Sequence, residues 1–230
     1  ILGDTRRQAA MNSIVEQFGV SFTPGTLVSD VREDDSENPS LLIGRFTQAA
    51  ADNFALYKRP KEWGQVVTMP ETAGLVFDAS KGFEMIPVLT TDSTYWTELQ
   101  TTNFVDSIPA FNPEKGELRG AYITAMALHR QINGKDQRVV ITGDADCVSN
   151  GEFGRSHGGY YSTNFTIISG TFSWLSYDEY PLNTERPSGK DSSLSISKST
   201  FKWAKYGFYV VYPFLLVVIG MTISIRRKRN

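Results

Sequence analysis

The stretch GAYITAMALHRQINGKDQRVVITGD, residues 120–144, carries the strongest fold signal in the chain. Two runs rich in β-branched and apolar residues flank Asn133-Gly134, the dipeptide most typical of a two-residue turn between antiparallel strands. The sequence therefore predicts a β-hairpin at this point. His129 lies in the first strand of the hairpin, where we expect a surface or cross-strand pair.

The second strand of the hairpin continues into the loop RVVITGDADCVSN, residues 138–150. Asp144 and Asp146 follow the strand in D-x-D spacing, and carboxylate oxygens in such a loop are suitable ligands for a divalent cation. Glu152 and His157 are the nearest residues that would complete a cation site. Because D-x-D spacing is also frequent by chance, a structural interpretation of this loop competes with the metal site, and we favour it.

The structural interpretation treats the loop as the tight exit of a buried strand. Gly143 turns the chain, and aspartate side chains cap turns or the start of a following helix. Cys147 would be a nucleophile only at a sharp elbow with small flanking residues, and its neighbours are Asp146 and Val148. Adjacent carboxylates also oppose thiolate formation. We therefore expect Cys147 to be a buried packing residue.

Upstream of the hairpin, helix and strand signals alternate. TRRQAAMNSIVEQFGV predicts a helix that stops at Gly19. Its apolar residues share one face: Met11, Ile14, Val15 and Phe18. Strands are predicted for TLVSDV, SLLIGRFTQ, GQVVTMP and ETAGLVFD. GFEMIPVLTTDSTYWTEL predicts an apolar strand, a polar turn and then the start of a helix near Tyr95 and Trp96.

Downstream of the loop, STNFTIISGTFSWLS predicts a helix capped by Ser162 or Asn164. Apolar residues recur in it at helical spacing: Phe165, Ile168, Phe172 and Leu175. Asn164 also begins a glycosylation acceptor sequence, N-F-T, which matters only in a eukaryotic lumen. Together these segments indicate an α/β domain without internal repeats.

An uncharged stretch near the C-terminus predicts a membrane span. YGFYVVYPFLLVVIGMTISI runs from Tyr206 to Ile225, and as a helix it reaches about 30 Å, the thickness of the hydrocarbon core of a bilayer. Pro213 and Gly220 are tolerated in such helices. Aromatic rings gather at the upstream end, where amphipathic side chains favour the membrane interface: Trp203, Tyr206, Tyr209 and Tyr212. The alternative is a buried helix of a soluble core.

A basic run closes this span. Arg226 and Arg227 open the tail RRKRN, which holds four cations and no acid. By the positive-inside rule the tail should be cytoplasmic and the body of the protein extracytoplasmic. Lys202 and Lys205, at the other end of the span, weaken this bias without reversing it.

The chain divides by composition into four parts. Residues 1–182 form the predicted α/β domain, which begins on a sequence typical of a domain interior, so we expect it to be incomplete at its N-terminus. Residues 183–200 are a Ser-rich tether. Residues 201–225 form the transmembrane helix, and residues 226–230 the basic tail.

Charge and composition exclude several functions. The chain carries 23 Lys and Arg against 25 Asp and Glu. Because four of the cations lie in the tail, the rest of the chain has 19 basic residues against 25 acidic ones and is net negative. A domain with a net negative charge lacks the basic character typical of nucleic-acid-binding proteins. A single cysteine excludes an intrachain disulfide and a cysteine zinc cluster. The sequence has no Walker A motif and no G-x-G-x-x-G motif, so we expect no ATP hydrolysis by this chain.

Taken in order, these segments resemble the C-terminal part of the gliding-motility ABC-transporter auxiliary family, the GldG type. SIVEQFGVSFTPGTLVSD, PVLTTDSTYWTE, QRVVITGDADCVSN and NFTIISGTFSWLS are each similar to a family segment, and the apolar span with its basic tail is similar to the family's membrane anchor. The resemblance implies a Rossmann-like extracytoplasmic domain with no catalytic residue and no cofactor. It implies a structural motif at Gly143, Asp144, Asp146, Asn150 and Trp174.

The resemblance also implies partners and a location. The chain would be a non-enzymatic auxiliary subunit in a bacterial inner membrane, with a periplasmic body and an anchor in membrane lipid. Its partners would be an ABC permease and its ATPase, with Gly220 at a helix contact. Two alternatives stay open: a membrane-tethered metal-dependent hydrolase or transferase that uses Asp144 and Asp146, and a luminal subunit of a glycosylation complex. A glycan attached to Asn164 would favour the luminal glycosylation subunit.

Overall fold

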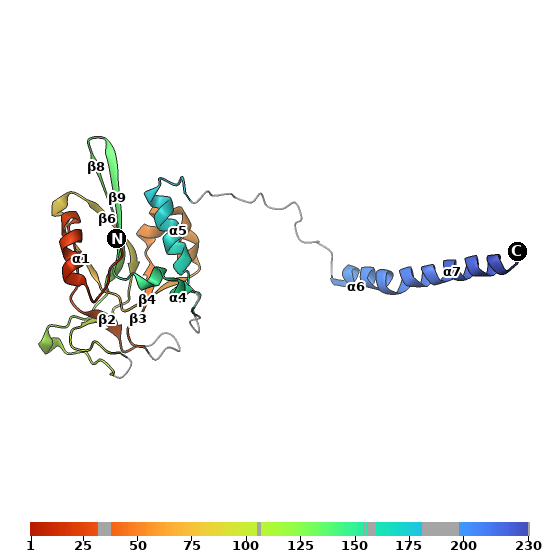
Figure 1. The fold of residues 1–230 in the computed structure, drawn as a ribbon, viewed down its shortest axis with the longest axis horizontal. Coiled ribbons are helices and arrows are strands. Elements are labelled where there is room, and N and C mark those ends of the chain that lie inside the picture. Colours follow the sequence, from red (N-terminus) through yellow and green to blue (C-terminus); the bar gives the residue numbers. More distant parts are fainter. Residues whose placement is uncertain (32–37, 105–106, 154, 156–159, 181–197, 230) are drawn as a thin grey trace. The chain divides into compact units, whose positions relative to one another are not determined.

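The computed structural model describes residues 1–31, 38–104, 107–153, 155, 160–180 and 198–229. The chain separates into two units, Ile1–Leu182 and Asn183–Asn230. The first unit contains two sheets and several short helices, and the second contains one long helix (Figure 1). The predicted tether lies outside the described residues over 183–197, and its last three residues belong to the long helix.

A seven-stranded sheet forms the centre of the first unit (Figure 1). Its strands run in the order β1-β5-β8-β6-β3-β4, and β9 pairs with β8. Their bounds are β1 Val20–Phe22, β3 Leu41–Phe46, β4 Val66–Pro70, β5 Leu75–Phe77, β6 Glu84–Thr90, β8 Ile123–Ile132 and β9 Lys135–Thr142. Every strand pair in this sheet is antiparallel.

The predicted hairpin is confirmed as β8 and β9, which pair from Ala125 to Ile132. Asn133 and Gly134 have φ angles of 52° and 74°, the positive values that a type I′ turn requires at both central positions. His129 lies opposite Arg138, and its Nε2 atom is 3.5 Å from a carboxylate oxygen of Glu84 on β6. The predicted cross-strand environment of His129 is therefore correct.

The mixed α/β class is confirmed, but the Rossmann-like arrangement is not. A Rossmann-like sheet is mostly parallel, because helical crossovers return each strand in the same direction. Here the two-residue turn between β8 and β9 forces an antiparallel pair, and β8 is antiparallel to its other neighbours as well. The described parallel contacts are isolated bridges, not strands of the sheet.

A second, two-stranded sheet corrects the prediction of a helix near Tyr95. Strand β7 Tyr95–Glu98 pairs antiparallel with β2 Thr26–Ser29, and all four of its residues are buried. The preceding turn is closed by Asp92, whose side chain accepts a hydrogen bond from the amide of Thr94 at 2.8 Å. Aromatic and β-branched residues favour a pleated surface over a helix, so Y-W-T-E continues from this turn as a strand.

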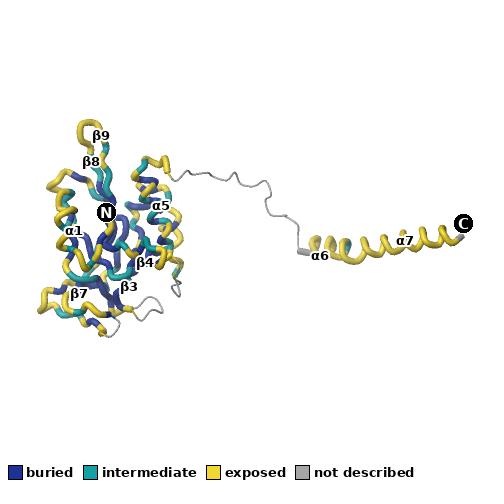
Figure 2. The backbone as a smooth tube through the Cα atoms, in the orientation of Figure 1, coloured by how far each residue is buried: buried dark blue, intermediate teal, exposed yellow. Residues whose placement is uncertain are grey.

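Helices cover both faces of the large sheet (Figure 2). Their bounds are α1 Gln8–Val15, α2 Gln48–Asn53, α3 Lys58–Glu62, α4 Asn150–Phe153 and α5 Asn164–Leu175, with short 3-10 turns η1 Glu16–Phe18, η2 Ala55–Tyr57, η3 Ala79–Lys81, η4 Pro113–Lys115 and η5 Asp146–Val148. The predicted first helix is confirmed as α1 and the 3-10 turn η1 that continues it, and Gly19 is the left-handed C-cap of η1 at a φ angle of 75°. Val15 is buried, whereas Ile14 of the predicted apolar face is 46% exposed.

Helix α5 is present where it was predicted, but most of its predicted apolar face points away from the core: Ile168 packs partly against the core, whereas Phe165, Phe172 and Leu175 are exposed. Phe165 and Phe172 are 70% and 62% exposed, while Trp174 is buried. Gly170 explains the orientation, because a Cβ atom there would lie 2.0 Å from the ring of Tyr57. The absence of that Cβ lets the helix approach η2 through the face that carries Ile167, Gly170 and Trp174, and it leaves Phe165 and Phe172 outside.

The second unit contains one long helix made of α6 Lys198–Tyr206, the π-helical turn η6 Gly207–Val211 and α7 Tyr212–Arg229. Within the described residues, Thr200–Lys228 is the one helix long and apolar enough to cross a membrane. The π-helical turn precedes Pro213, which has no N–H to bond the carbonyl of Tyr209. Gly220, Arg226 and the apolar residues between them are exposed, so this part of the helix packs against none of the described residues of its own unit (Figure 2).

Candidate functional site

Gly143 fixes where the loop leaves the sheet. Its amide donates a hydrogen bond to the carbonyl of Thr124 at 2.7 Å, and its carbonyl accepts one from the amide of Ala73 at 3.1 Å. A Cβ atom at this position would lie 1.9 Å from the Ala73 carbonyl oxygen. Gly143 is therefore required by the close approach of two backbone segments, and the predicted tight exit of the strand is correct.

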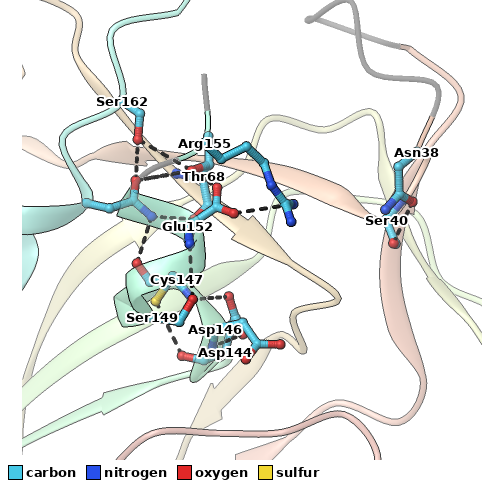
Figure 3. A network of polar contacts seen from close by, with 11 residues as sticks. Asn38, Ser40, Thr68, Asp144, Asp146, Cys147, Ser149, Glu152, Arg155 and Ser162 are labelled. Carbon is cyan, nitrogen blue, oxygen red and sulfur yellow. Dashed lines mark hydrogen bonds and ion pairs between the residues drawn. The ribbon is translucent and has the colours of Figure 1, made fainter. Parts of the chain in front are cut away.

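Asp144 closes the turn that follows. Its side chain is buried, and its two carboxylate oxygens accept hydrogen bonds from the amides of Asp146 at 2.7 Å and Cys147 at 2.9 Å (Figure 3). The hydroxyl of Thr142 donates to the main-chain oxygen of Asp144 at 2.8 Å. Asp144 thus satisfies the backbone donors that begin η5, as the structural interpretation predicts.

The two carboxylates of the D-x-D pair lie in different environments. Asp144 is 3% exposed, whereas Asp146 faces solvent at the start of η5. Among the described residues, no group of three His, Cys, Asp or Glu side chains is close enough to hold a metal ion. His157, one of the two further ligands proposed from the sequence, lies outside the described residues. The metal hypothesis therefore gains no third ligand from the described part of the chain.

Cys147 is fully buried, in agreement with its predicted packing role. Its sulfur donates to the main-chain oxygen of Asp144 at 3.4 Å. Burial raises the pKa of the thiol, and the nearby carboxylates of Asp144, Glu152 and Asp146 raise this pKa further. The thiol therefore stays protonated near neutral pH, which is the wrong state for a nucleophile.

Glu152 is a buried carboxylate whose role the sequence did not indicate. It lies on α4, where its amide donates to the hydroxyl of Ser149 at 3.1 Å. Its side chain is 3% exposed and accepts a hydrogen bond from the hydroxyl of Thr68 on β4, and Arg155 lies 3.4 Å from its second oxygen (Figure 3). Glu152 therefore joins α4 to the sheet, and Arg155 balances part of its charge.

Asn164 connects three elements of this site. Its side-chain nitrogen donates to the main-chain oxygens of Thr68 at 2.7 Å and Cys147 at 2.8 Å, and its side-chain oxygen accepts from the amide of Thr68 at 3.0 Å. Thr163 holds the N-cap position of α5 without a side-chain cap, so neither Ser162 nor Asn164 caps the helix as predicted. Because the Asn164 amide is buried and fully bonded, this fold leaves no room for a glycan on it.

The remaining motif residues lie apart from this network. Asn150 is the exposed first residue of α4, and Trp174 lies near the other end of α5, stacked on Phe54 with ring centroids 5.2 Å apart. A hollow of about 350 Å³ lies next to the network and is lined by Arg155, Asn164 and several aromatic rings. Neither carboxylate of the D-x-D pair lines it. The arrangement holds a loop in place, and the acids of the D-x-D pair do not line this hollow.

Asp144 makes the stability of this site depend on pH. Burial is the main cause that raises the pKa of its carboxyl from 3.8 to about 7, against the two backbone amides, which lower that pKa. Between about pH 4 and pH 7 the folded state therefore holds a proton that the unfolded state has lost. The contribution of Asp144 to stability is fully present below pH 4 and is lost as the pH rises through 7.

We expect Asp144→Asn to remove this part of the pH dependence. The free energy of unfolding of the unmodified chain should fall more steeply between pH 4.5 and pH 7.5 than that of the variant, because asparagine does not ionise. The measurement is urea unfolding in mild detergent at several pH values. Asp52→Asn is the matched control, since that side chain is exposed on α2 and is not among the groups that shift the pKa of Asp144, and it should keep the slope of the unmodified chain. Equal slopes for all three proteins would contradict the assignment.

Comparison with known proteins identifies no family for this chain. No protein-family model matches the sequence, and no curated protein is significantly similar to it. The resemblance to the GldG type therefore stays a prediction, and the function has to be argued from the two units of the chain.

Proposed function

We propose that this protein is a non-enzymatic auxiliary subunit of a bacterial ABC-type transport system. Its α/β unit works on the periplasmic side of the inner membrane, and its C-terminal helix holds it beside the permease. The observation that carries the proposal is the long apolar helix of the second unit, Thr200–Lys228. The resemblance of the chain to the gliding-motility auxiliary family supplies the type of transporter.

The exposed apolar surface of this helix supports a membrane anchor. Each apolar side chain from Phe208 to Ile225 is exposed within its unit, and burying such side chains in lipid or against another helix yields about 1.5–3 kcal/mol each. At about 1.5 Å per residue, the helix is longer than the hydrocarbon core of a bilayer. Arg226 and Arg227 favour a cytoplasmic C-terminus, and Tyr206 and Trp203 suit the opposite interface.

The geometry of the loop supports a non-catalytic role. Both carboxylate oxygens of Asp144 accept hydrogen bonds from backbone amides, and the thiol of Cys147 is buried and protonated. The alternative hydrolase would need Asp144 and Asp146 to hold a metal together, although one is buried and the other exposed. Of the alternatives, the glycosylation subunit receives the least support, since the Asn164 amide is buried.

The decisive experiment is purification of the tagged protein from its native membranes in mild detergent. We expect a permease and its ATPase to be recovered in near-equal amounts, because an anchor of this kind packs against a partner in the same membrane. The control is a form truncated after Leu182, which lacks the helix and should leave the membrane fraction and lose the partners. Recovery of the full-length protein alone, while other membrane complexes stay intact, would contradict the proposal.

The enzyme alternative needs a separate test. Asp144→Asn combined with Asp146→Asn should leave the recovery of the partners unchanged if the protein is an auxiliary subunit. A metal-dependent activity that the unmodified protein shows and this double variant loses would favour the hydrolase or transferase instead.

A further inference from the structure

The upstream part of the long helix gathers two lysines and two tyrosines on one face. Lys202 lies three residues before Lys205 and four before Tyr206, and Tyr209 lies three and four residues after these two. Such spacings place side chains next to one another on a helix. The structure confirms the neighbourhood, because these four residues and Val210 line a hollow of about 400 Å³. Its lining residues supply two ammonium groups and two phenol hydroxyls.

The hollow lies where the helix is irregular. Lys202, Lys205 and Tyr206 belong to α6, whereas Tyr209 and Val210 belong to the π-helical turn η6 that follows it. A π-helical turn closes its hydrogen bonds over five residues, and such turns are frequent at functional sites within helices. The irregular turn is therefore a second feature of this place in the helix, separate from its charge.

The described part of the second unit offers the two lysines no counter-charge. Residues 198–229 contain no Asp or Glu, and both lysines are exposed within the unit. Two like charges three residues apart on a helix repel each other, so an anion held between Lys202 and Lys205 would relieve this repulsion. The charge of the hollow therefore suits a negatively charged ligand.

The position of the hollow along the helix indicates where this anion comes from, and this step rests on the membrane span of the proposed function. Twenty residues before Arg226 fill the hydrocarbon core of a bilayer, about 30 Å, and the first of them is Tyr206. Lys202 then lies about 6 Å outside the core, within a headgroup region that is about 5–8 Å thick in each leaflet. At this depth the two lysines meet lipid phosphate groups.

We propose that this hollow binds the headgroup of an anionic phospholipid in the leaflet that α6 enters. Lys202 and Lys205 donate charge-assisted hydrogen bonds to the phosphate oxygens, and the hydroxyls of Tyr206 and Tyr209 donate to the same group. Val210 faces the upper part of the acyl chains. A zwitterionic lipid also carries a phosphate, but its own cationic group would lie beside two lysines, so the hollow prefers a headgroup with a net negative charge.

Photocrosslinking in vesicles tests this preference at the level of single residues. The full-length protein is reconstituted in phosphatidylcholine with a trace of either phosphatidylglycerol or phosphatidylcholine that carries the same photoactivatable group high on its acyl chain. Peptide mass spectrometry then locates the crosslinks. We expect residues 202–210 to be crosslinked at least about 10-fold more by the phosphatidylglycerol probe, because each lysine near an anionic headgroup strengthens binding on the order of fivefold.

Paired substitutions show which side chains cause the preference. Lys202→Gln with Lys205→Gln should bring the two yields at residues 202–210 to within about twofold of each other. Arg227→Gln with Lys228→Gln is the matched control, since it removes two cations at the other end of the helix and should leave the preference unchanged. Glutamine keeps a helix propensity similar to that of lysine and arginine.

Two further measurements distinguish a built hollow from general attraction. Tyr206→Phe with Tyr209→Phe keeps both charges and should lower the preference at least about threefold, because the two hydroxyls no longer donate to the phosphate. Excess inorganic phosphate should not compete with the lipid probe. A preference that survives the loss of both hydroxyls, or is abolished by inorganic phosphate, would overturn the proposal.

The crosslinks also separate a failure of this inference from a failure of the membrane anchor. Crosslinks along residues 206–225 with equal yields from the two probes at residues 202–210 would overturn the inference and leave the anchor intact. A lysine pair whose replacement leaves the preference unchanged would do the same. An absence of lipid crosslinks along the whole span would overturn the anchor of the proposed function together with the inference.

Discussion

Replacing Gly143 by alanine should lower the free energy of unfolding by about 3 kcal/mol or more, the largest effect expected from so small a change. The added methyl group would lie 1.9 Å from the carbonyl oxygen of Ala73 and 2.8 Å from the hydroxyl of Thr72. Relief of this clash requires the backbone at Gly143 or Ala73 to move, and the hydrogen bond between these two residues would be lost. For a unit of this size we expect a fall in Tm of at least roughly 6 °C.

Gly120→Ala is the matched control for Gly143→Ala. Among the described residues, none has an atom within 4 Å of a Cβ atom added at Gly120, apart from its chain neighbours, and the φ angle of Gly120 is not in the left-handed region. The control should therefore leave the Tm within about 2 °C of that of the unmodified chain. Thermal unfolding in mild detergent, followed by tryptophan fluorescence, measures both variants. A Gly143→Ala protein as stable as the control would show that the loop does not leave β9 by the tight path described.

The parts of the fold that could be predicted from the sequence are those fixed by neighbours along the chain. Asn133-Gly134 defines the hairpin because positive φ angles at both positions suit only a few residues. Gly19 ends the first helix for a similar reason. The local pattern predicts the start of a helix at Tyr95 and Trp96, whereas their strand β7 pairs with β2, far away in the sequence. That pairing has no local signal beyond β-propensity, which is a weak guide.

In the candidate site, too, the residues that could be predicted are those whose partners are close in the sequence. The capping role of Asp144 could be predicted because its two hydrogen-bond partners lie within three residues of it. Glu152 and Asn164 could not be placed, because both bond to Thr68 on a strand that precedes them by more than eighty residues. The one available signal is the position of Asn164 at the start of an otherwise apolar segment, and this position does not identify the residue to which Asn164 bonds.

The orientation of α5 could not be predicted, because the stronger apolar pattern lies on its exposed side. Phe172 and Trp174 are two residues apart and therefore point in different directions. Hydrophobic periodicity favours Phe172 as the core residue, whereas the structure buries Trp174. The close packing of Gly170 on Tyr57 decides between these orientations. Hydrophobic periodicity does not detect it, because it depends on side chains that are present and glycine has none.

Trp174→Ala tests this orientation directly, and we expect it to lower the free energy of unfolding by about 3–5 kcal/mol. The indole stacks on Phe54, and the guanidinium of Arg138 lies 4.8 Å from its ring centroid, so truncation leaves a cavity and removes both contacts. Phe172→Ala should cost less than about 1 kcal/mol, because its ring is 62% exposed. Urea unfolding compares the two variants. A larger loss for Phe172→Ala than for Trp174→Ala would mean that α5 packs through Phe165 and Phe172 instead, and would contradict the orientation described.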